Sequence, residues 1–318
     1  MSFLVFIDTN IYLDFYRYRN DLSLSLLRRL DNNHDRIITT AEVEMEYKKN
    51  RQKVILEALH SIKPQSAGQL YIPSFLKEST YNKTSSRLVK EWNALASKLL
   101  IRTEKLLESP GRYDPVYRIL QRLFKARATC HLSRGNKMRK EIREKAQKRY
   151  LLGYPPRKPD DTSIGDSINW EWIIHCATQC HDDIVLISRD SDYGALDKNN
   201  YYLNDWLIQE FKERVSRKRS ITLTGRLSEG FGIAGITVPE EEKQAEEKFL
   251  QVLQESAARL RKLDELRNPY NRINDSLSLF ELRDNVLSLF PPTTTRNLID
   301  DEPSQLEQLD KESDEESS

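Results

Sequence analysis

Four acidic residues stand where a predicted strand ends or a predicted helix begins: Asp8, Glu46, Asp166 and Asp190. In an open parallel sheet the loops at the carboxyl ends of the strands converge, so we expect these side chains to meet there. Carboxylates held close together repel one another and raise each other's pKa unless a cation lies between them. The pattern therefore predicts a metal site, with Asp192 as a further ligand beside Asp190.

The predicted donor set contains only oxygen atoms, which select Mg²⁺ or Mn²⁺ over Zn²⁺. We expect four residues to hold the ion: Asp8, Asp166, Asp190 and Asp192. Asp166 opens a predicted helix, whose dipole favours the ionised carboxylate. Paired hard metals about 4 Å apart activate water and stabilise a leaving oxygen in phosphodiester cleavage. Simpler roles stay open, because Asp8 and Asp166 could cap helices and Asp192 could occupy a turn.

The elements that would position these acids alternate between short apolar runs and helical stretches, which is typical of an α/β fold with a mostly parallel central sheet. The apolar runs predict strands at residues 2–7, 36–39, 184–187, 221–223 and 235–238. Helical periodicity predicts helices at residues 22–30, 41–60, 166–180, 204–217 and 240–267. Residues 75–150 are predicted to be helical throughout and to form an insertion between the units of the sheet.

Changes in composition divide the 318 residues into a domain at 1–238 with its insert at about 75–150, a helical extension at 239–290, and a disordered acidic tail at 291–318. The tail is expected to aid solubility, although it could also imitate nucleic acid and inhibit the domain. The helix at 240–267 could pack back on the domain, or contact a second copy or a protein partner.

The stretch from Arg118 to Lys158 is strongly basic, although the whole chain has a formal net charge of only +1. This stretch is either the solvated side of a helix pair or a clamp that follows phosphates toward the acids. For the clamp we expect these contacts with nucleic acid: Arg139, Lys140, Arg143, Lys148, Arg149 and Lys158. Lys158 and Asn169 are weaker candidates for direct contact with substrate.

Four segments together resemble the PIN domain superfamily of nucleases: residues 7–10 (Ile-Asp-Thr-Asn), 43–47 (Val-Glu-Met-Glu-Tyr), 165–166 (Gly-Asp) and 186–193 (Leu-Ile-Ser-Arg-Asp-Ser-Asp-Tyr). The chain is most similar to the larger bacterial PIN-like proteins with a helical insert, over residues 1 to about 215. The resemblance implies a three-layer PIN-like fold and a metal-dependent endoribonuclease that leaves 5′-phosphate and 3′-hydroxyl ends. RNA is the implied substrate, with single-stranded DNA as a second candidate. The sequence leaves a toxin, a defence and a housekeeping setting open.

The resemblance assigns the acidic site to Asp8, Glu46, Asp166 and Asp190, with Asp192 as an optional extra. It implies that Thr9, Asn10 and Ser188 orient the carboxylates by hydrogen bonds, with Asn169 in support. The glutamate position is ambiguous, because Glu42, Glu44 and Glu46 lie close together in the sequence. Glu46 has the family's spacing from Val43, and Glu42 shares its helix face.

Other classes of protein fit less well. A haloacid-dehalogenase-like phosphatase would need a second aspartate at position 10, where this chain has Asn10. The segment from His175 to His181 does not predict zinc, since one helix cannot easily supply four tetrahedral ligands. No glycine-rich phosphate loop is present. The remaining alternative is an inactive PIN-like scaffold that binds RNA or a protein through the basic insert.

The sequence predicts neither a membrane protein nor a disulfide-stabilised one. No apolar run approaches the ~20 residues that a membrane span requires. The N-terminus lacks the basic and then apolar layout of a secretory signal. Three cysteines make an odd number in a chain of this length, which argues against a disulfide framework. The expected location is the cytoplasm.

Overall fold

The structure is a computed structural model, and it describes residues 2–18, 22–59, 75, 79–126, 129–157, 163–197 and 200–267. The chain divides into two compact units, residues 1–253 and 254–318. All contacts given below lie within the first unit. The division predicted from composition, with boundaries at residues 238 and 290, stays a prediction, and the proposed acidic tail lies outside the described residues.

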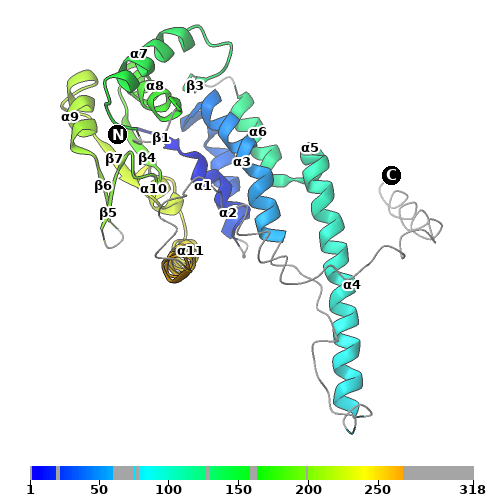
Figure 1. The fold of residues 1–318 in the computed structure, drawn as a ribbon. Helices are drawn as coiled ribbons and strands as arrows, with labels where there is room; N and C mark the ends of the chain where they lie inside the picture. Colours follow the sequence, from blue (N-terminus) through cyan, green and yellow to red (C-terminus); the bar gives the residue numbers. More distant parts are fainter. Residues whose placement is uncertain are drawn as a thin grey trace, which may run out of the picture. The chain divides into compact units, whose positions relative to one another are not determined.

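The core of the fold is a five-stranded parallel sheet with the strand order β3-β2-β1-β4-β7 (Figure 1). Its strands are β1 (Phe3–Ile7), β2 (Ile37–Thr40), β3 (His131–Leu132), β4 (Asp183–Ile187) and β7 (Ile221–Thr224). β1 and β4 pair over five residues, from Phe3 opposite Asp183 to Ile7 opposite Ile187. The two central strands therefore end at the same level, and the residues that follow them leave the sheet side by side.

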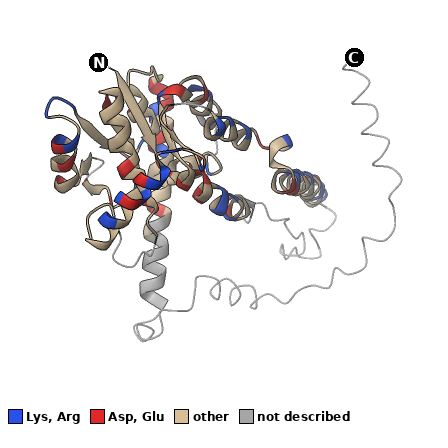
Figure 2. Cartoon of the chain, turned by 90° about the horizontal axis from the view of Figure 1, so that it is seen from above, with Lys and Arg blue, Asp and Glu red and all other residues tan. Residues whose placement is uncertain are grey.

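Helices flank this sheet in the three-layer α/β arrangement. They are α1 (Thr9–Asp14), α2 (Leu22–Asn32), the 3₁₀ turn η1 (His34–Arg36), α3 (Ala41–Leu59), α4 (Thr80–Glu108), α5 (Pro110–Tyr113), α6 (Pro115–Lys125), α7 (Arg139–Leu151), α8 (Gly165–Cys180), α9 (Asp205–Arg214), α10 (Leu227–Ile233) and α11 (Glu240–Arg267). A two-stranded antiparallel hairpin, β5 (Gly194–Asp197) and β6 (Asn200–Leu203), precedes α9. Figure 2 shows charged residues mainly on helices and loops around strands that are largely tan.

Two of the predicted elements are wrong. Residues 235–238 form no strand, because they complete the end of α10: Gly235 has a φ of +74° and the Ile236 N–H donates to the Phe231 carbonyl at 2.8 Å. The insert is not helical throughout, because β3 interrupts it and pairs with β2 as an edge strand. Two residues are too short a run for periodicity to reveal.

The long helix α4 confirms the helical part of the insert, but its apolar stripe is not part of the core. Four side chains at three-to-four spacing stay exposed on it: Leu88, Trp92, Leu95 and Leu99. Among the described helices, none is long and apolar enough to cross a membrane.

A buried ion pair ties the insert to the sheet domain. Arg51 of α3 donates to Asp114 from Nε at 2.9 Å and from Nη2 at 2.6 Å. Asp114 also accepts the Tyr16 hydroxyl at 2.7 Å and, as N-cap of α6, the Tyr117 N–H at 2.9 Å. Both charged side chains are almost fully buried. Three segments that are distant in sequence therefore depend on one carboxylate.

The first part of α11 packs back on the domain. Glu246 is buried, and its carboxylate accepts the N–H groups of Leu227 and Ser228 at 2.8 Å each, at the start of α10. Phe249 lies against Tyr18 with 4.3 Å between the ring centroids. Of the alternatives for this helix, the structure confirms packing on the domain for these residues. A contact with a second copy or a partner through its remainder stays a prediction.

Replacing Asp114 by Asn should destabilise the protein by about 3–5 kcal/mol, because the Arg51 charge would stay buried without its partner. Asn keeps the cap of α6, so a lost cap does not confuse the result. The measurement is the free energy of unfolding in urea. The double variant Arg51→Met/Asp114→Asn should recover much of the loss, and additive losses would contradict a coupled pair.

Candidate functional site

Three of the predicted acids form a compact group. Asp166 lies in the first turn of α8, and Asp190 and Asp192 lie in the loop that follows β4. Each can offer a carboxylate oxygen that is within 4.8 Å of those of the other two, and all three side chains are half-buried. The loop is closed by its own hydrogen bonds, since the Asp192 N–H donates to Asp190 Oδ1 at 3.2 Å.

Asp8 lies directly after β1, where its carboxylate is held from three sides. Oδ1 accepts the Thr9 N–H at 2.7 Å, and Oδ2 accepts the Asn10 amide at 2.8 Å and the Ser188 hydroxyl at 2.5 Å. Asp8 is the N-cap of α1 and only 6% exposed. Capping and a place in the site are therefore compatible at this residue. Asn10 and Ser188 orient Asp8 by the kind of hydrogen bond expected of them.

Burial and mutual repulsion raise the pKa values of two of these acids. Burial raises the pKa of Asp8 to about 6, the Ser188 and Thr9 hydrogen bonds oppose the rise, and Glu46 and Asp190 add to it. Burial also raises the pKa of Asp166 to about 8, and its neighbours contribute in the order Asp8, Asp190, Glu46 and Asp192. This rise is opposite in direction to the expected effect of the helix dipole on Asp166, because burial and the neighbouring carboxylates disfavour the ionised form.

Glu46, and not Glu42, belongs to this group. The Thr9 hydroxyl donates to Glu46 Oε2 at 3.0 Å, which leaves Thr9 bound to Glu46 by its side chain and to Asp8 by its backbone. Glu46 is exposed at the rim, and its charge raises the pKa of Asp8 and of Asp166. Glu42, one turn earlier, instead accepts Arg139 Nη2 at 2.9 Å.

Two tyrosines line the group and were not among the predicted residues. Tyr12 and Tyr193 are fully buried, and within the described part of the chain their hydroxyls have no hydrogen-bond partner. Burial raises the pKa of Tyr193 well above its usual value, and the nearby charges of Asp166 and Asp8 raise it further. Tyr193 is the last residue of the segment 186–193. Its position directly after Asp192 could have indicated that it lies near the acids. Tyr12 reads as an ordinary core residue in the sequence.

Arg189 is a second residue that sequence reasoning missed. Its guanidinium binds the buried carboxylate of Asp14 and donates to the Gly225 carbonyl at 3.2 Å and the Asn10 carbonyl at 3.4 Å. It therefore links the loop after β4 to α1 and to the loop after β7. Nothing in the sequence distinguishes this arginine from one that binds substrate.

Asn169 is buried rather than presented to a substrate. Its amide oxygen accepts the Thr40 hydroxyl at 2.6 Å, and the same hydroxyl oxygen accepts the Val43 N–H at 3.1 Å. Asn169 thus supports the start of α3, the helix that carries Glu46. Its predicted direct contact with substrate is corrected to this indirect support.

The residues predicted to contact nucleic acid differ in their exposure to solvent. Lys140, Arg143 and Lys148 are exposed on α7, whereas Arg139 is largely engaged with Glu42. An open hollow of about 460 Å³ runs along this end of α7, and its lining contains five basic residues and one acid: Arg134, Lys137, Arg139, Lys140, Arg143 and Glu144. Lys158 lies outside the described residues.

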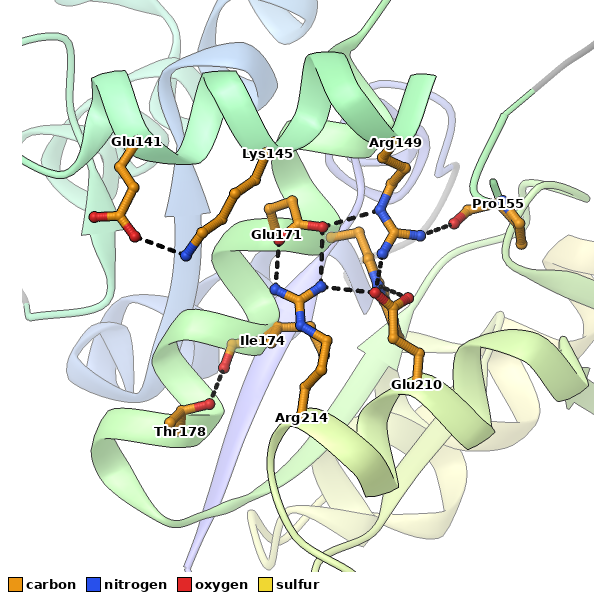
Figure 3. Close-up of polar contacts among 10 residues, drawn as sticks. Glu141, Lys145, Arg149, Pro155, Glu171, Ile174, Thr178, Glu210 and Arg214 are labelled. Carbon is orange, nitrogen blue, oxygen red and sulfur yellow. Dashed lines mark hydrogen bonds and ion pairs between the residues drawn. The ribbon is translucent and has the colours of Figure 1, made fainter. Parts of the chain in front are cut away.

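Arg149 is a correction, because it is only 4% exposed and cannot meet nucleic acid. Its Nε donates to Glu171 Oε1 at 3.0 Å, and it also binds Glu210 and the Pro155 carbonyl (Figure 3). Arg214 completes the network by donating to Glu171 Oε2 at 2.6 Å. The guanidinium of Arg149 thus joins α7 to α8 and α9 by ion pairs within the protein.

The cysteines give no zinc site among the described residues. Cys130, Cys176 and Cys180 are free thiols, and Cys130 Sγ lies 4.0 Å from Cys180 Sγ. Among the described residues, the group whose ligand atoms lie close enough together to hold a metal ion is Asp166, Asp190 and Asp192, and it contains no thiol.

The residues present fit a hard divalent cation. The ligand set is all oxygen, as Mg²⁺ and Mn²⁺ prefer. The raised pKa values of Asp8 and Asp166 mark an excess of negative charge that a cation would neutralise. The buried hydroxyl of Tyr193, beside these acids, could donate to a carboxylate or to a water of such an ion.

The metal-free protein should lose stability as the pH rises from about 4 to about 8. In the fold, the pKa of Asp8 is raised from 3.8 to about 6 and that of Asp166 from 3.8 to about 8. This contribution to stability is complete only below the unfolded-state pKa, where both carboxyls are protonated in the folded and the unfolded chain alike. It is lost between that value and each folded-state pKa, because there the unfolded chain ionises while the fold keeps its proton. Mg²⁺ or Mn²⁺ at about 100 times its Kd should then raise the melting temperature by about 5–10 °C near pH 8, and by less near pH 5.

The variant Asp190→Asn should lose most of this metal-dependent shift in differential scanning fluorimetry. An equal shift in Asp190→Asn and in the native protein would place the ion elsewhere.

Comparison with known proteins gives one finding. No curated protein and no solved structure shows significant similarity to the chain. A family model described as PIN domain matches residues 5–193, which is more than half of the chain. The matched stretch begins in β1 and ends at Tyr193, so it contains all five acids of the site. The chain belongs to the PIN domain family, whose fold is of the nuclease type.

Proposed function

We propose that this protein is a metal-dependent endoribonuclease that hydrolyses RNA phosphodiesters to 5′-phosphate and 3′-hydroxyl ends. The observation that carries the proposal is the convergence of Asp8, Asp166, Asp190 and Asp192, with Glu46 at the rim, beyond the carboxyl ends of β1 and β4. Ordinary surface acids do not share a half-buried site that raises their pKa values, and such clusters concentrate at functional sites.

The residues of the site have different roles in the proposed reaction. Asp166, Asp190 and Asp192 would hold the cation, since their oxygens lie closest together. A bound divalent cation would supply activation of water and stabilisation of negative charge on the phosphate oxygens. Glu46 is exposed and held by Thr9, so it can orient a water and accept its proton. Asp8, oriented by Asn10 and Ser188, would add a fixed negative charge that attracts the cation to the site.

The exposed bases of α7 would bring RNA to this site. Arg143 and Lys140 line the basic hollow, and α7 packs against α8, the helix that begins with the Asp166 turn. Phosphate contacts of this kind attract nucleic acid irrespective of its sequence. We also propose that the protein works in the cytoplasm and that single-stranded DNA is its second candidate substrate.

An inactive scaffold that binds RNA or a protein is the second candidate. One observation favours it: both carboxylate oxygens of Asp8 already accept hydrogen bonds from protein donors, as those of a structural cap would. A scaffold would bind RNA and leave it uncut in Mg²⁺ or Mn²⁺. Incubation with labelled single-stranded RNA, structured RNA and single-stranded DNA separates the two candidates.

Replacing Asp166 by Asn should lower the rate of RNA cleavage by about 10²-fold or more, because a ligand and its charge are lost. The same change should raise the melting temperature of the metal-free protein near pH 8, since the cost of burying an ionised carboxylate and its repulsion by the neighbouring acids are both removed. Lost activity in a more stable protein cannot be attributed to unfolding. An Asp166→Asn variant that cuts at the native rate would refute the assigned site.

The glutamates offer a matched pair for the same cleavage assay. Glu46→Gln should slow cleavage about 10-fold to 100-fold, because a proton acceptor at the rim is lost. Glu42→Gln removes a carboxylate one turn away and should leave the rate near native, since Glu42 pairs with Arg139. The reverse order would reassign the functional glutamate.

Replacing Lys140, Arg143 and Lys148 together by Ala should weaken binding to every RNA sequence. It should also reduce the slope of log K against log salt by about 2, since each lost phosphate contact on a single strand accounts for about 0.7. Arg149→Ala should leave that slope unchanged and lower the melting temperature instead. Fluorescence anisotropy in EDTA measures the slopes, and an unchanged slope in the triple variant would exclude α7 as the clamp.

A further inference from the structure

Two aromatic side chains form an exposed pair that the proposed reaction does not use. The rings of Tyr154 and Trp206 lie with centroids 5.2 Å apart and planes at 37°. Tyr154 is 39% exposed and Trp206 is 45% exposed, whereas Trp170 and Trp172 are buried in the core. The two residues are distant in the sequence, so the fold brings them together.

Both members of the pair are attached to segments that supply acids. Asn204 caps α9 by accepting the Trp206 N–H at 2.9 Å, and its own N–H donates to the Tyr193 carbonyl at 2.9 Å. Tyr193 directly follows Asp192. The turn that bears Tyr154 continues to Pro156, whose carbonyl accepts the Ser167 hydroxyl at 3.5 Å, and Ser167 directly follows Asp166.

The Arg149 network holds the pair in place. Arg149 binds the carbonyl of Pro155, the residue after Tyr154, and the carboxylate of Glu210, which lies one turn after Trp206 on α9 (Figure 3). Arg214 and Glu171 complete the charges, with Arg214 Nη1 2.7 Å from Glu210 Oε1. The buried ions thus tie the turn after Tyr154 to α9, which limits the motion of the pair and reduces the entropy lost when a ligand binds it.

An exposed aromatic pair on two segments that are hydrogen-bonded to neighbours of the acids suits one class of ligand. Unpaired nucleobases stack on aromatic faces whatever their identity, and a cationic surface beside such faces follows the phosphates. Arg157, three residues after Tyr154, supplies a cation in the same turn, where its guanidinium carbon lies 4.4 Å from the ring centroid of Tyr150. Bases inside a duplex have both faces covered and could not use the pair.

We propose that Tyr154 and Trp206 form a stacking site for an unpaired base of single-stranded RNA, beside the phosphodiester that enters the acidic site. This inference rests on the proposed nuclease function and makes single-stranded RNA its substrate class.

The test is the binding of a fluorescein-labelled single-stranded oligoribonucleotide to the full-length protein in EDTA, measured by anisotropy. Trp206→Ala and Tyr154→Ala should each weaken binding about 5-fold to 100-fold, the range for loss of one stacked base. The salt slope should not change, since neither side chain is charged. Trp206→Phe should restore most of the affinity. Trp92→Ala is the matched control, because Trp92 is 44% exposed on α4.

An oligonucleotide of the same length with abasic sites separates stacking from attraction to phosphates. The native protein should bind it more weakly than the normal strand, and Trp206→Ala should cause no further loss. Equal binding of the normal strand by native protein, Trp206→Ala and Tyr154→Ala would overturn the stacking site and leave the nuclease proposal standing. Failure of the native protein to bind any RNA would overturn both.

Discussion

The burial of several carboxylates beside one another is the constraint on which the rest of this structure depends. The pKa values of Asp8 and Asp166 are raised to about 6 and about 8, so the fold holds both carboxyls in surroundings that favour the protonated form. The five-residue pairing of β1 with β4 makes this possible, since it is a rigid parallel ladder in the middle of the sheet. The Ser188 hydroxyl and the Thr9 N–H then oppose part of the rise in the pKa of Asp8 by donating to its carboxylate.

Two buried ionic networks brace the elements around this strained centre. Arg51 and Asp114 hold the inserted helices to α3, and α3 carries Glu46. Arg149 and Glu171 join α7 to α8, which carries Asp166. Buried ion pairs add little stability relative to apolar packing, but each fixes one geometry, because a displaced partner leaves an uncompensated charge. They keep the acidic residues from moving apart.

The sequence predicted the fold class and the position of the acids well, because both depend on local patterns. Apolar runs followed by an acid revealed β1 and β4, because strands buried on both faces consist almost entirely of apolar residues. Short elements could not be predicted in this way. β3 has only two residues, which is too few for a pattern. The segment after α10 forms no strand because Gly235 has a positive φ. The spacing from Val43 favoured Glu46 over Glu42, and the contacts of Thr9 with Glu46 and of Arg139 with Glu42 support that choice.

The basic stretch shows the limit of reasoning from charge along a chain. Arg143 and Arg149 lie on the same helix and are identical in type, yet one is exposed and the other sits among acids of α8 and α9. Those acids are distant in sequence, so a local excess of positive charge is balanced by tertiary contacts. A periodic pattern identifies which residues share a helix face, but not what that face meets. For Arg149 the facing element is α9, and the same contact that removes it from the phosphate-binding surface sets Trp206 beside Tyr154.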